Sequence, residues 1–427
     1  MASPRVRIGL TAAVGVAISL AAAVHRHRTG YVEHGYQPSV ELDVGSEEFL
    51  RALEALTGAA VTTGNDLRVL TNGDEIFPAV LETIRGATTT LNLLTFVYWR
   101  GEIAVEVADA VIERAQAGVR CNVLLDAFGA ARMDEGLVQR MEAAGVHVER
   151  FRPFKPYTIT KADHRTHRKV IVADGTVGMI GGVGIAQEWT GNAQDPDHWR
   201  DTHVRVQGPV VRALQGAFLE NWLEATGELL AGDDYLPELE PISDGSHMQV
   251  VVSGPGVNHT NTEAMYFLAI ASARRTIQLT TAYFAPRRMF VEALRAAAER
   301  GVDVEIIVPG PHIDKQFVRT AGRAVYGRLL EAGITIHEYQ PTMLHAKTLV
   351  IDGRWCSIGS ANFDNRSFAL NDEATLCVQS ELVARQLEDA FSSDRDASTK
   401  IQPSRWRWRS PLQRVAEAAA TLGRREL

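Results

Sequence analysis

Two stretches of the chain carry the same group of residues that could do chemistry. In each, a histidine is followed two positions later by a lysine: His167 with Lys169, and His345 with Lys347. Four residues then lead to an Asp-Gly pair, and six residues separate the aspartate from a Gly-Gly or Gly-Ser pair. A single His-x-Lys is most often a polar strand edge. Two copies with the same internal spacing indicate a duplicated functional unit.

The residues around each histidine indicate how the pair is positioned. Residues 170–172 and 349–351 have the apolar, β-branched composition of buried strands. Side chains two apart on a strand point to the same side, so each histidine should share a face with its lysine. Asp-Gly is a favoured hairpin turn, so each strand should fold back on a second strand. Asp174 and Asp352 belong to the repeated unit and are candidate catalytic residues, but their place in the turn favours a structural role.

Two histidines and two lysines without an accompanying set of metal ligands indicate phosphoryl transfer without a metal or cofactor. A neutral imidazole can attack phosphorus and form a phospho-histidine intermediate. A second, protonated imidazole can donate to the leaving alcohol and later accept the proton of the acceptor. The two lysines would neutralise charge on the phosphoryl oxygens. The candidate substrate-binding residues are Arg165, Gly182, Ser360 and Asn362.

A carboxylate follows each glycine pair at a matched place. Aligning Gln207 with Gln379 puts Asp201 opposite Glu373, each six residues upstream. A carboxylate on the far ring nitrogen of an imidazole fixes its tautomer and stabilises the imidazolium, so both acids are predicted to orient a histidine.

The two histidines differ in the cations that are close in sequence. Arg165, Arg168 and Lys169 surround His167, whereas His345 has fewer basic neighbours. Nearby positive charge lowers the pKa of an imidazole, so we expect His345 to hold a proton more readily than His167.

The order of predicted elements favours an α/β fold. Strands and helices alternate over residues 90–151, and the same order returns over 276–339. We predict a duplicated domain with two mixed, mostly parallel sheets flanked by helices and with the active site between the halves. The predicted parts are a hydrophobic anchor or leader at 1–30, a helical lead-in at 46–63, the first half at 64–229, a linker at 230–247, the second half at 248–400 and a Trp/Arg-rich amphipathic tail at 401–427.

Both ends of the chain suggest a membrane partner. Residues 8–24 carry no charge, which favours an uncleaved anchor over a cleaved signal peptide. Residues 405–409 alternate arginine and tryptophan, a pattern that suits the headgroup layer of an anionic phospholipid membrane. The alternative is a tail whose tryptophans pack on the domain. No oligomeric state is predicted.

Composition argues against nucleic-acid binding and against disulfide bonds. The chain has 427 residues and a formal net charge of -8, which argues against a general nucleic-acid binder. Its cysteines, Cys121, Cys356 and Cys377, lie in apolar runs and are predicted to be reduced core residues.

The repeated His-x-Lys-x4-Asp unit resembles the motif of the phospholipase D superfamily, and the resemblance covers residues 64–400. Within that superfamily the chain most resembles bacterial cardiolipin synthases, on residues 199–209, 283–286 and 359–373. The resemblance implies metal-independent phosphatidyl transfer at the bacterial inner membrane. Phosphatidylglycerol would be donor and acceptor, and glycerol would leave. The resemblance also implies His167 as nucleophile and His345 as acid and base.

The first unit departs from the superfamily pattern at one position. Gly184 stands where the second unit has Asn362, so one side chain that could hold phosphate is missing from the first half. Two other activities of the superfamily stay open: a phospholipase D hydrolase that releases phosphatidic acid, and a phosphodiesterase or nuclease.

Overall fold

The computed structural model describes residues 40–153, 164–255 and 261–420. The predicted anchor at 1–30 lies outside these ranges, as do residues 421–427 of the predicted tail. No helix within the described ranges is long and apolar enough to span a bilayer.

The first half begins with α2 (Glu47–Thr57), which is capped by the Ser46 side chain. The elements that follow are β1 (Thr62–Thr71), α3 (Asn72–Arg85), β2 (Thr90–Thr95), α4 (Glu102–Gln116), β3 (Arg120–Asp126), α5 (Glu135–Ala143), β4 (His147–Phe151), β5 (Val170–Ala173), β6 (Val177–Gly181), the 3-10 turn η2 (Gln187–Trp189), β7 (Thr202–Gln207) and α6 (Val211–Thr226).

The second half repeats the order of the first and ends in two short helices. Its elements are β8 (Ser246–Ser253), α7 (Asn261–Ser272), β9 (Thr276–Thr280), β10 (Phe284–Ala285), α8 (Arg288–Glu299), β11 (Asp303–Pro309), α9 (Gln316–Glu331), β12 (Thr335–Tyr339), β13 (Thr348–Ile351), β14 (Trp355–Gly359), β15 (Phe363–Asp364), α10 (Asn365–Ala369), β16 (Glu373–Gln379), α11 (Glu381–Asp396), β17 (Ser398–Lys400), α12 (Pro403–Arg407) and α13 (Pro411–Ala420).

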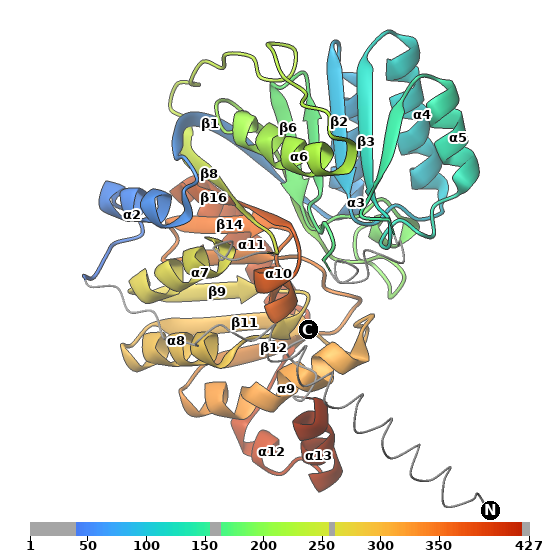
Figure 1. Cartoon of the computed structure of the whole chain (residues 1–427). Helices are drawn as coiled ribbons and strands as arrows, with labels where there is room; N and C mark the ends of the chain where they lie inside the picture. Colours follow the sequence, from blue (N-terminus) through green and yellow to red (C-terminus); the bar gives the residue numbers. More distant parts are fainter. Residues whose placement is uncertain (1–39, 154–163, 256–260, 421–427) are drawn as a thin grey trace, which may run out of the picture. The chain divides into compact units, whose positions relative to one another are not determined.

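All described strands except β10 and β15, which pair only with each other, join in one sheet that runs through both halves (Figure 1). Its 15 strands run in the order β17-β12-β11-β9-β13-β14-β16-β8-β1-β7-β6-β5-β2-β3-β4. The antiparallel pair β1–β8 connects the halves. Parallel pairing within this sheet is confined to β2-β3-β4 and β9-β11-β12, where helices connect the strands. The predicted α/β class and duplication are confirmed. The sheet differs in being continuous and largely antiparallel, because parallel pairs need a crossover connection and only β2-β3-β4 and β9-β11-β12 have crossover helices.

The two predicted hairpins are confirmed. β5 pairs antiparallel with β6, and β13 pairs antiparallel with β14. At each turn the aspartate and the glycine both have positive φ: 53° and 63° at Asp174 and Gly175, and 57° and 65° at Asp352 and Gly353. Two successive residues with positive φ define the type I′ turn, which matches the twist of the flanking strands.

The hairpin strands are buried on both faces, which brings the halves together. Ile171 packs into a core of the first half with α3, α4 and α5. Its neighbours Val170 and Val172 face the other way, into a cluster that also contains Val350 and Leu376 of the second half. Because this cluster draws on both halves, the starts of β5 and β13 lie at their junction.

Candidate active site

His167 is held by a backbone bridge from the opposite half. It lies just before β5, where Thr166 pairs in parallel with Asp372 of the second half. The His167 amide donates to the Asp372 carbonyl oxygen at 2.8 Å, and the Asp372 amide donates to the Arg165 carbonyl oxygen at 2.9 Å. The main chain therefore sets the position of His167 beside residues 372 and 373.

His345 is held in the same way with the halves exchanged. It lies just before β13, where Leu344 pairs in parallel with Arg200 of the first half. The His345 amide donates to the Arg200 carbonyl oxygen at 2.7 Å, and the Arg200 amide donates to the Met343 carbonyl oxygen at 2.9 Å. The two bridges relate the halves by a local pseudo-two-fold symmetry.

Each histidine pairs with a carboxylate of the opposite half. His167 Nδ1 lies 3.0 Å from Glu373 Oε2, and His345 Nδ1 lies 2.7 Å from Asp201 Oδ2. All four side chains are buried. The matched acids predicted from the repeat are therefore brought to the histidines, but the pairing crosses between the halves. With Nδ1–H donating to a carboxylate, Nε2 is the ring nitrogen that each histidine can offer to phosphorus.

The environment keeps both histidines neutral in the absence of substrate. Burial lowers the pKa of His167 to about 4 and that of His345 to about 3, and in each case the paired carboxylate opposes the shift. The pKa shift has the same direction and the same main cause at both histidines, so the structure gives no support to the expectation that His345 would hold its proton more readily. Lys347 Nζ lies 2.9 Å from His345 Nδ1, whereas Arg168 points to the opposite face of its strand and donates to the Ala217 carbonyl oxygen at 2.8 Å.

The two lysines lie on the same strand faces as their histidines, as predicted. Lys169 Nζ donates to the His167 carbonyl oxygen at 2.7 Å, and Lys347 Nζ donates to the His345 carbonyl oxygen. Burial lowers the pKa of Lys169 to about 7 and that of Lys347 to about 8. Both can supply positive charge to a phosphoryl group at neutral pH. A bound anion stabilises the protonated form of each lysine.

The motif aspartates lie at the far ends of the strands from the histidines. Asp174 accepts hydrogen bonds from the backbone amides of residues 88, 89 and 90. Asp352 accepts from the amides of residues 274, 275 and 276. A strand rises about 3.3 Å per residue, so about 20 Å separate each aspartate from its histidine along the chain. These contacts support the structural role over the catalytic one.

The second residue of each glycine pair adjoins the orienting acid. Ser360 Oγ donates to Glu373 Oε2 and accepts from the Ala374 amide at 3.1 Å. A Cβ atom at Gly182 would lie 2.2 Å from Asp201 Oδ1. Both positions were predicted to bind substrate. Their contacts instead favour a role in placing the carboxylates.

Asn362 and Arg165 have different partners. The Asn362 side chain is buried, and its Oδ1 has no hydrogen-bond partner among the described residues, which leaves an acceptor for a ligand hydroxyl. The Arg165 guanidinium donates to the carbonyl oxygens of His164 and Arg152 at 3.0 Å, and lies 3.8 Å from Asp126. A substrate-binding role for either residue stays a prediction.

Three aromatic rings enclose the histidines. Phe96 meets the His167 ring edge-on at 5.1 Å between centroids, and Trp189 meets the His345 ring edge-on at 5.1 Å. Trp199 lies 5.7 Å from His345. These rings displace water from the imidazoles. Sequence reasoning did not single out Phe96 or Trp189, because an aromatic residue in an apolar stretch has no spacing that separates it from the core.

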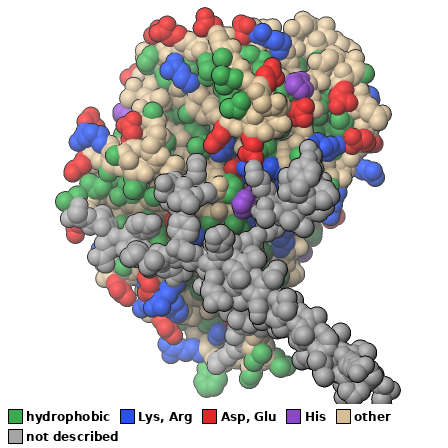
Figure 2. All heavy atoms as spheres, in the orientation of Figure 1, with side chains coloured by type: hydrophobic (Ala, Val, Ile, Leu, Met, Phe, Trp, Pro, Cys, Tyr) green, Lys and Arg blue, Asp and Glu red, His purple; other side chains and the backbone are tan. Residues whose placement is uncertain are grey.

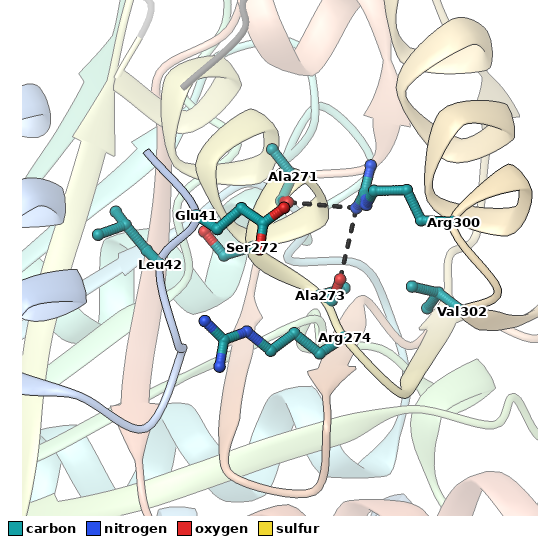
Figure 3. A pocket seen from close by; sticks show the side chains of 8 residues that line it. All are labelled: Glu41, Leu42, Ala271, Ser272, Ala273, Arg274, Arg300 and Val302. Atoms are coloured by element: carbon teal, nitrogen blue, oxygen red, sulfur yellow. Dashed lines mark hydrogen bonds between the residues drawn. The ribbon is translucent and has the colours of Figure 1, made fainter. Parts of the chain in front are cut away.

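An open cavity of about 380 Å³ lies elsewhere, beside α7 (Figure 3). Glu41, Arg274 and Arg300 line it. Arg300 donates to the carbonyl oxygens of Ala271 and Ala273 and so caps the end of α7, while Arg274 lies 3.5 Å from Asp43. The cations are engaged with the protein and no histidine lines the cavity. In the ranges that the structure describes, no cluster of three or more His, Cys, Asp or Glu is arranged to hold a metal.

Comparison with known proteins finds a family model and relatives that are all described as cardiolipin synthases. The family model described as cardiolipin synthase, PLD-like domain, matches residues 80–212 and 266–395. The chain is 34% identical over 381 residues to a cardiolipin synthase of Halalkalibacterium halodurans, covering 88% of this chain and 76% of that protein. It is 33% identical over 386 residues to a cardiolipin synthase of Geobacillus, covering 90% and 77% respectively.

A solved structure supports the fold. The phosphatidylserine synthase of Haemophilus influenzae superposes with a TM-score of 0.69 at 13% identity, covering 90% of this chain and all of that one. Together the comparisons confirm the predicted enzyme class, a phosphatidyltransferase with cardiolipin synthase-type chemistry. The chain belongs to the cardiolipin synthase family of phospholipase D-like proteins.

Proposed function

We propose that this chain forms cardiolipin by moving a phosphatidyl group from one phosphatidylglycerol to another, with release of glycerol. The observation that carries the mechanism is the pair of crossed contacts, His167 with Glu373 and His345 with Asp201, beside two buried lysines. The family supplies the substrate class, since the relatives named above are cardiolipin synthases.

The first step builds a covalent intermediate. Nε2 of neutral His167 attacks phosphorus, the P–O bond to glycerol breaks, and His345 gives its proton to the leaving oxygen. A bound phosphodiester anion raises the pKa of His345 and so supplies the protonated form. Glu373 stabilises the positive charge on the phosphorylated His167 ring, and the lysines offset charge on the phosphoryl oxygens.

The second step reverses these roles around the acceptor. The terminal hydroxyl of a second phosphatidylglycerol gives its proton to His345 as its oxygen attacks phosphorus. The P–N bond to His167 breaks, and both histidines return to their starting states. Exclusion of water by Phe96, Trp189 and Trp199 favours the lipid alcohol over hydrolysis.

The products of phosphatidylglycerol distinguish the candidate activities. Purified protein incubated with phosphatidylglycerol vesicles and EDTA should yield cardiolipin and glycerol in equal amounts, because Lys169 and Lys347 supply the charge that a metal would supply. Phosphatidic acid as main product would indicate a hydrolase. Activity that EDTA removes and a divalent ion restores would contradict the metal-independent mechanism.

Nuclease activity is a weaker candidate, and the same experiment tests it. On the face drawn in Figure 2, the described Lys and Arg side chains are interspersed with Asp and Glu, rather than gathered in a basic stripe. Cleavage of added DNA with the lipid unchanged would nevertheless establish that activity.

The C-terminal helices support contact with an anionic lipid surface. Trp406 is buried against Tyr326, with ring centroids 5.3 Å apart, and Arg409 lies over its ring. Trp408 is 89% exposed, and Leu412 and Val415 follow it on the outer face of α13 at 81% and 67%. Trp406 therefore anchors the tail to α9. Trp408 faces solvent, with two apolar side chains and two exposed arginines nearby, and this combination suits a headgroup layer.

We predict that the triple substitution Trp408→Ser, Leu412→Ser and Val415→Ser weakens binding to phosphatidylglycerol liposomes by about tenfold or more, since each apolar side chain is worth about 1.5–3 kcal/mol when fully buried. Turnover of a soluble short-chain substrate should stay near wild type. Leu229→Ser, at a side chain that is 71% exposed between α6 and β8, is the matched control. Equal liposome binding by the triple variant and this control would contradict the assignment.

A further inference from the structure

The departure at Gly184 has a structural reason in a neighbouring tryptophan. A Cβ atom at Gly184 would lie 2.7 Å from Val97 Cβ and 3.3 Å from Trp189 Cη2. The second half has Asn362 at the matched position. Val97 and the Trp189 indole therefore fill the space that a side chain at position 184 would need. Trp189 itself is almost fully buried, with 2% exposure.

The indole of Trp189 reaches the orienting acid of the opposite histidine. Trp189 Nε1 donates to Asp201 Oδ2 at 2.8 Å. The same oxygen accepts from His345 Nδ1 at 2.7 Å, and the Thr202 amide donates to the other oxygen at 2.8 Å. The ring of Trp189 also meets the His345 ring edge-on. One side chain thus contacts both members of the Asp201–His345 pair.

The other half orients its acid with different donors. Glu373 accepts from the Ser360 hydroxyl and from Asn371 Nδ2 at 3.3 Å. Gly182, which matches Ser360, has no side chain to offer. The first half therefore lacks the serine donor, and the indole of Trp189 takes that role at Asp201.

We infer that Trp189 is a positioning residue, which fixes Asp201 through its indole N–H and thereby sets the orientation and basicity of His345. The inference uses the proposed function only in treating His345 as the acid and base. The N–H donor spreads the charge of the Asp201 carboxylate, so the His345 imidazolium is stabilised less and the imidazole is the stronger acid once protonated. The acid beside His167 accepts from the Ser360 hydroxyl, whereas the acid beside His345 accepts from the Trp189 indole N–H. The two histidines therefore have different surroundings.

Substitution of the indole tests the role of its N–H. Trp189→Phe keeps an aromatic ring beside His345 and removes the donor. Loss of this hydrogen bond to a charged group should lower kcat about 10- to 100-fold and change KM less than about twofold. Trp189→Tyr differs from Trp189→Phe by one hydroxyl, so partial recovery of kcat would report a donor and not ring packing.

A second readout does not depend on turnover. In protein with ¹⁵N-labelled histidine, the Nδ1–H proton of His345 should shift downfield in Trp189→Phe, because a carboxylate with one donor fewer is a stronger acceptor. The signal of His167 should stay unchanged, and assignments come from the His345→Ala and His167→Ala variants. Ser360→Ala should produce the reverse pattern, a shift at His167 alone.

Trp99→Phe is the control for loosened packing. Its ring lies 5.9 Å from that of Trp189, but its Nε1 donates to the Gly129 carbonyl oxygen at 2.8 Å and to no carboxylate. It should leave the His345 signal in place. Wild-type kcat and an unmoved His345 signal in Trp189→Phe, or equal shifts of both histidines, would overturn the inference. Because the spectra need no substrate, they test it even if wild-type protein forms no cardiolipin.

Discussion

Rapid acid quench with labelled phosphatidylglycerol should leave the phosphatidyl label on His167. The family resemblance implies this residue, and the geometry adds a physical reason. Each lysine donates to the carbonyl oxygen of its own histidine, but Lys347 Nζ also lies 2.9 Å from His345 Nδ1. Positive charge beside an imidazole lowers its basicity, which makes His345 the weaker nucleophile and, once protonated, the stronger acid.

Two variants separate the roles in the same experiment. His167→Ala should lose label and at least about 10⁴-fold in kcat, a loss typical of a missing nucleophile. His345→Ala should accumulate label on His167 when the donor carries an activated leaving group that needs no acid. Peptide mass mapping locates the label. Label on His345 in wild type, or any label retained by His167→Ala, would reverse the assignment.

Neutralising either orienting acid should lower kcat by about 10²- to 10⁴-fold, because an amide cannot stabilise an imidazolium as a carboxylate does. The crossed pairing makes the prediction specific. Glu373→Gln acts on His167, so its defect should persist with an activated donor. Asp201→Asn acts on His345, so formation of the intermediate should recover with that donor. Single-turnover rates with ordinary and activated phosphatidyl donors measure both.

Asp174→Asn is the matched control for these acids. Its carboxylate belongs to the same motif but holds three backbone amides at the hairpin turn. This substitution should lower the melting temperature without any preference between the two donors. The opposite assignment, recovery of Glu373→Gln and not of Asp201→Asn, would mean that each acid serves the histidine of its own half.

The sequence alone was sufficient for the features that depend on neighbouring residues. The period-2 alternation of a strand placed each lysine on the face of its histidine, and the Asp-Gly turns predicted both hairpins. The alternation of strands and helices predicted over residues 90–151 is also present; within it α4 (Glu102–Gln116) ends before Gly118, which has a φ of 92°. Repetition also brought out Asp201 and Glu373, because a duplicated chain shows each site twice.

Only the tertiary structure decided the features that depend on contacts between distant segments. The exchange of acids between the halves follows from the bridges Thr166–Asp372 and Leu344–Arg200, and no local pattern encodes them. The lowered pKa of His345 follows from its burial and from where Lys347 points, not from how many cations lie nearby in sequence. Two further features depend on packing between segments: the single sheet formed through β1 and β8, and the contact of Trp189 with Asp201. Burial and distance in space set the energies of such contacts, and sequence separation does not.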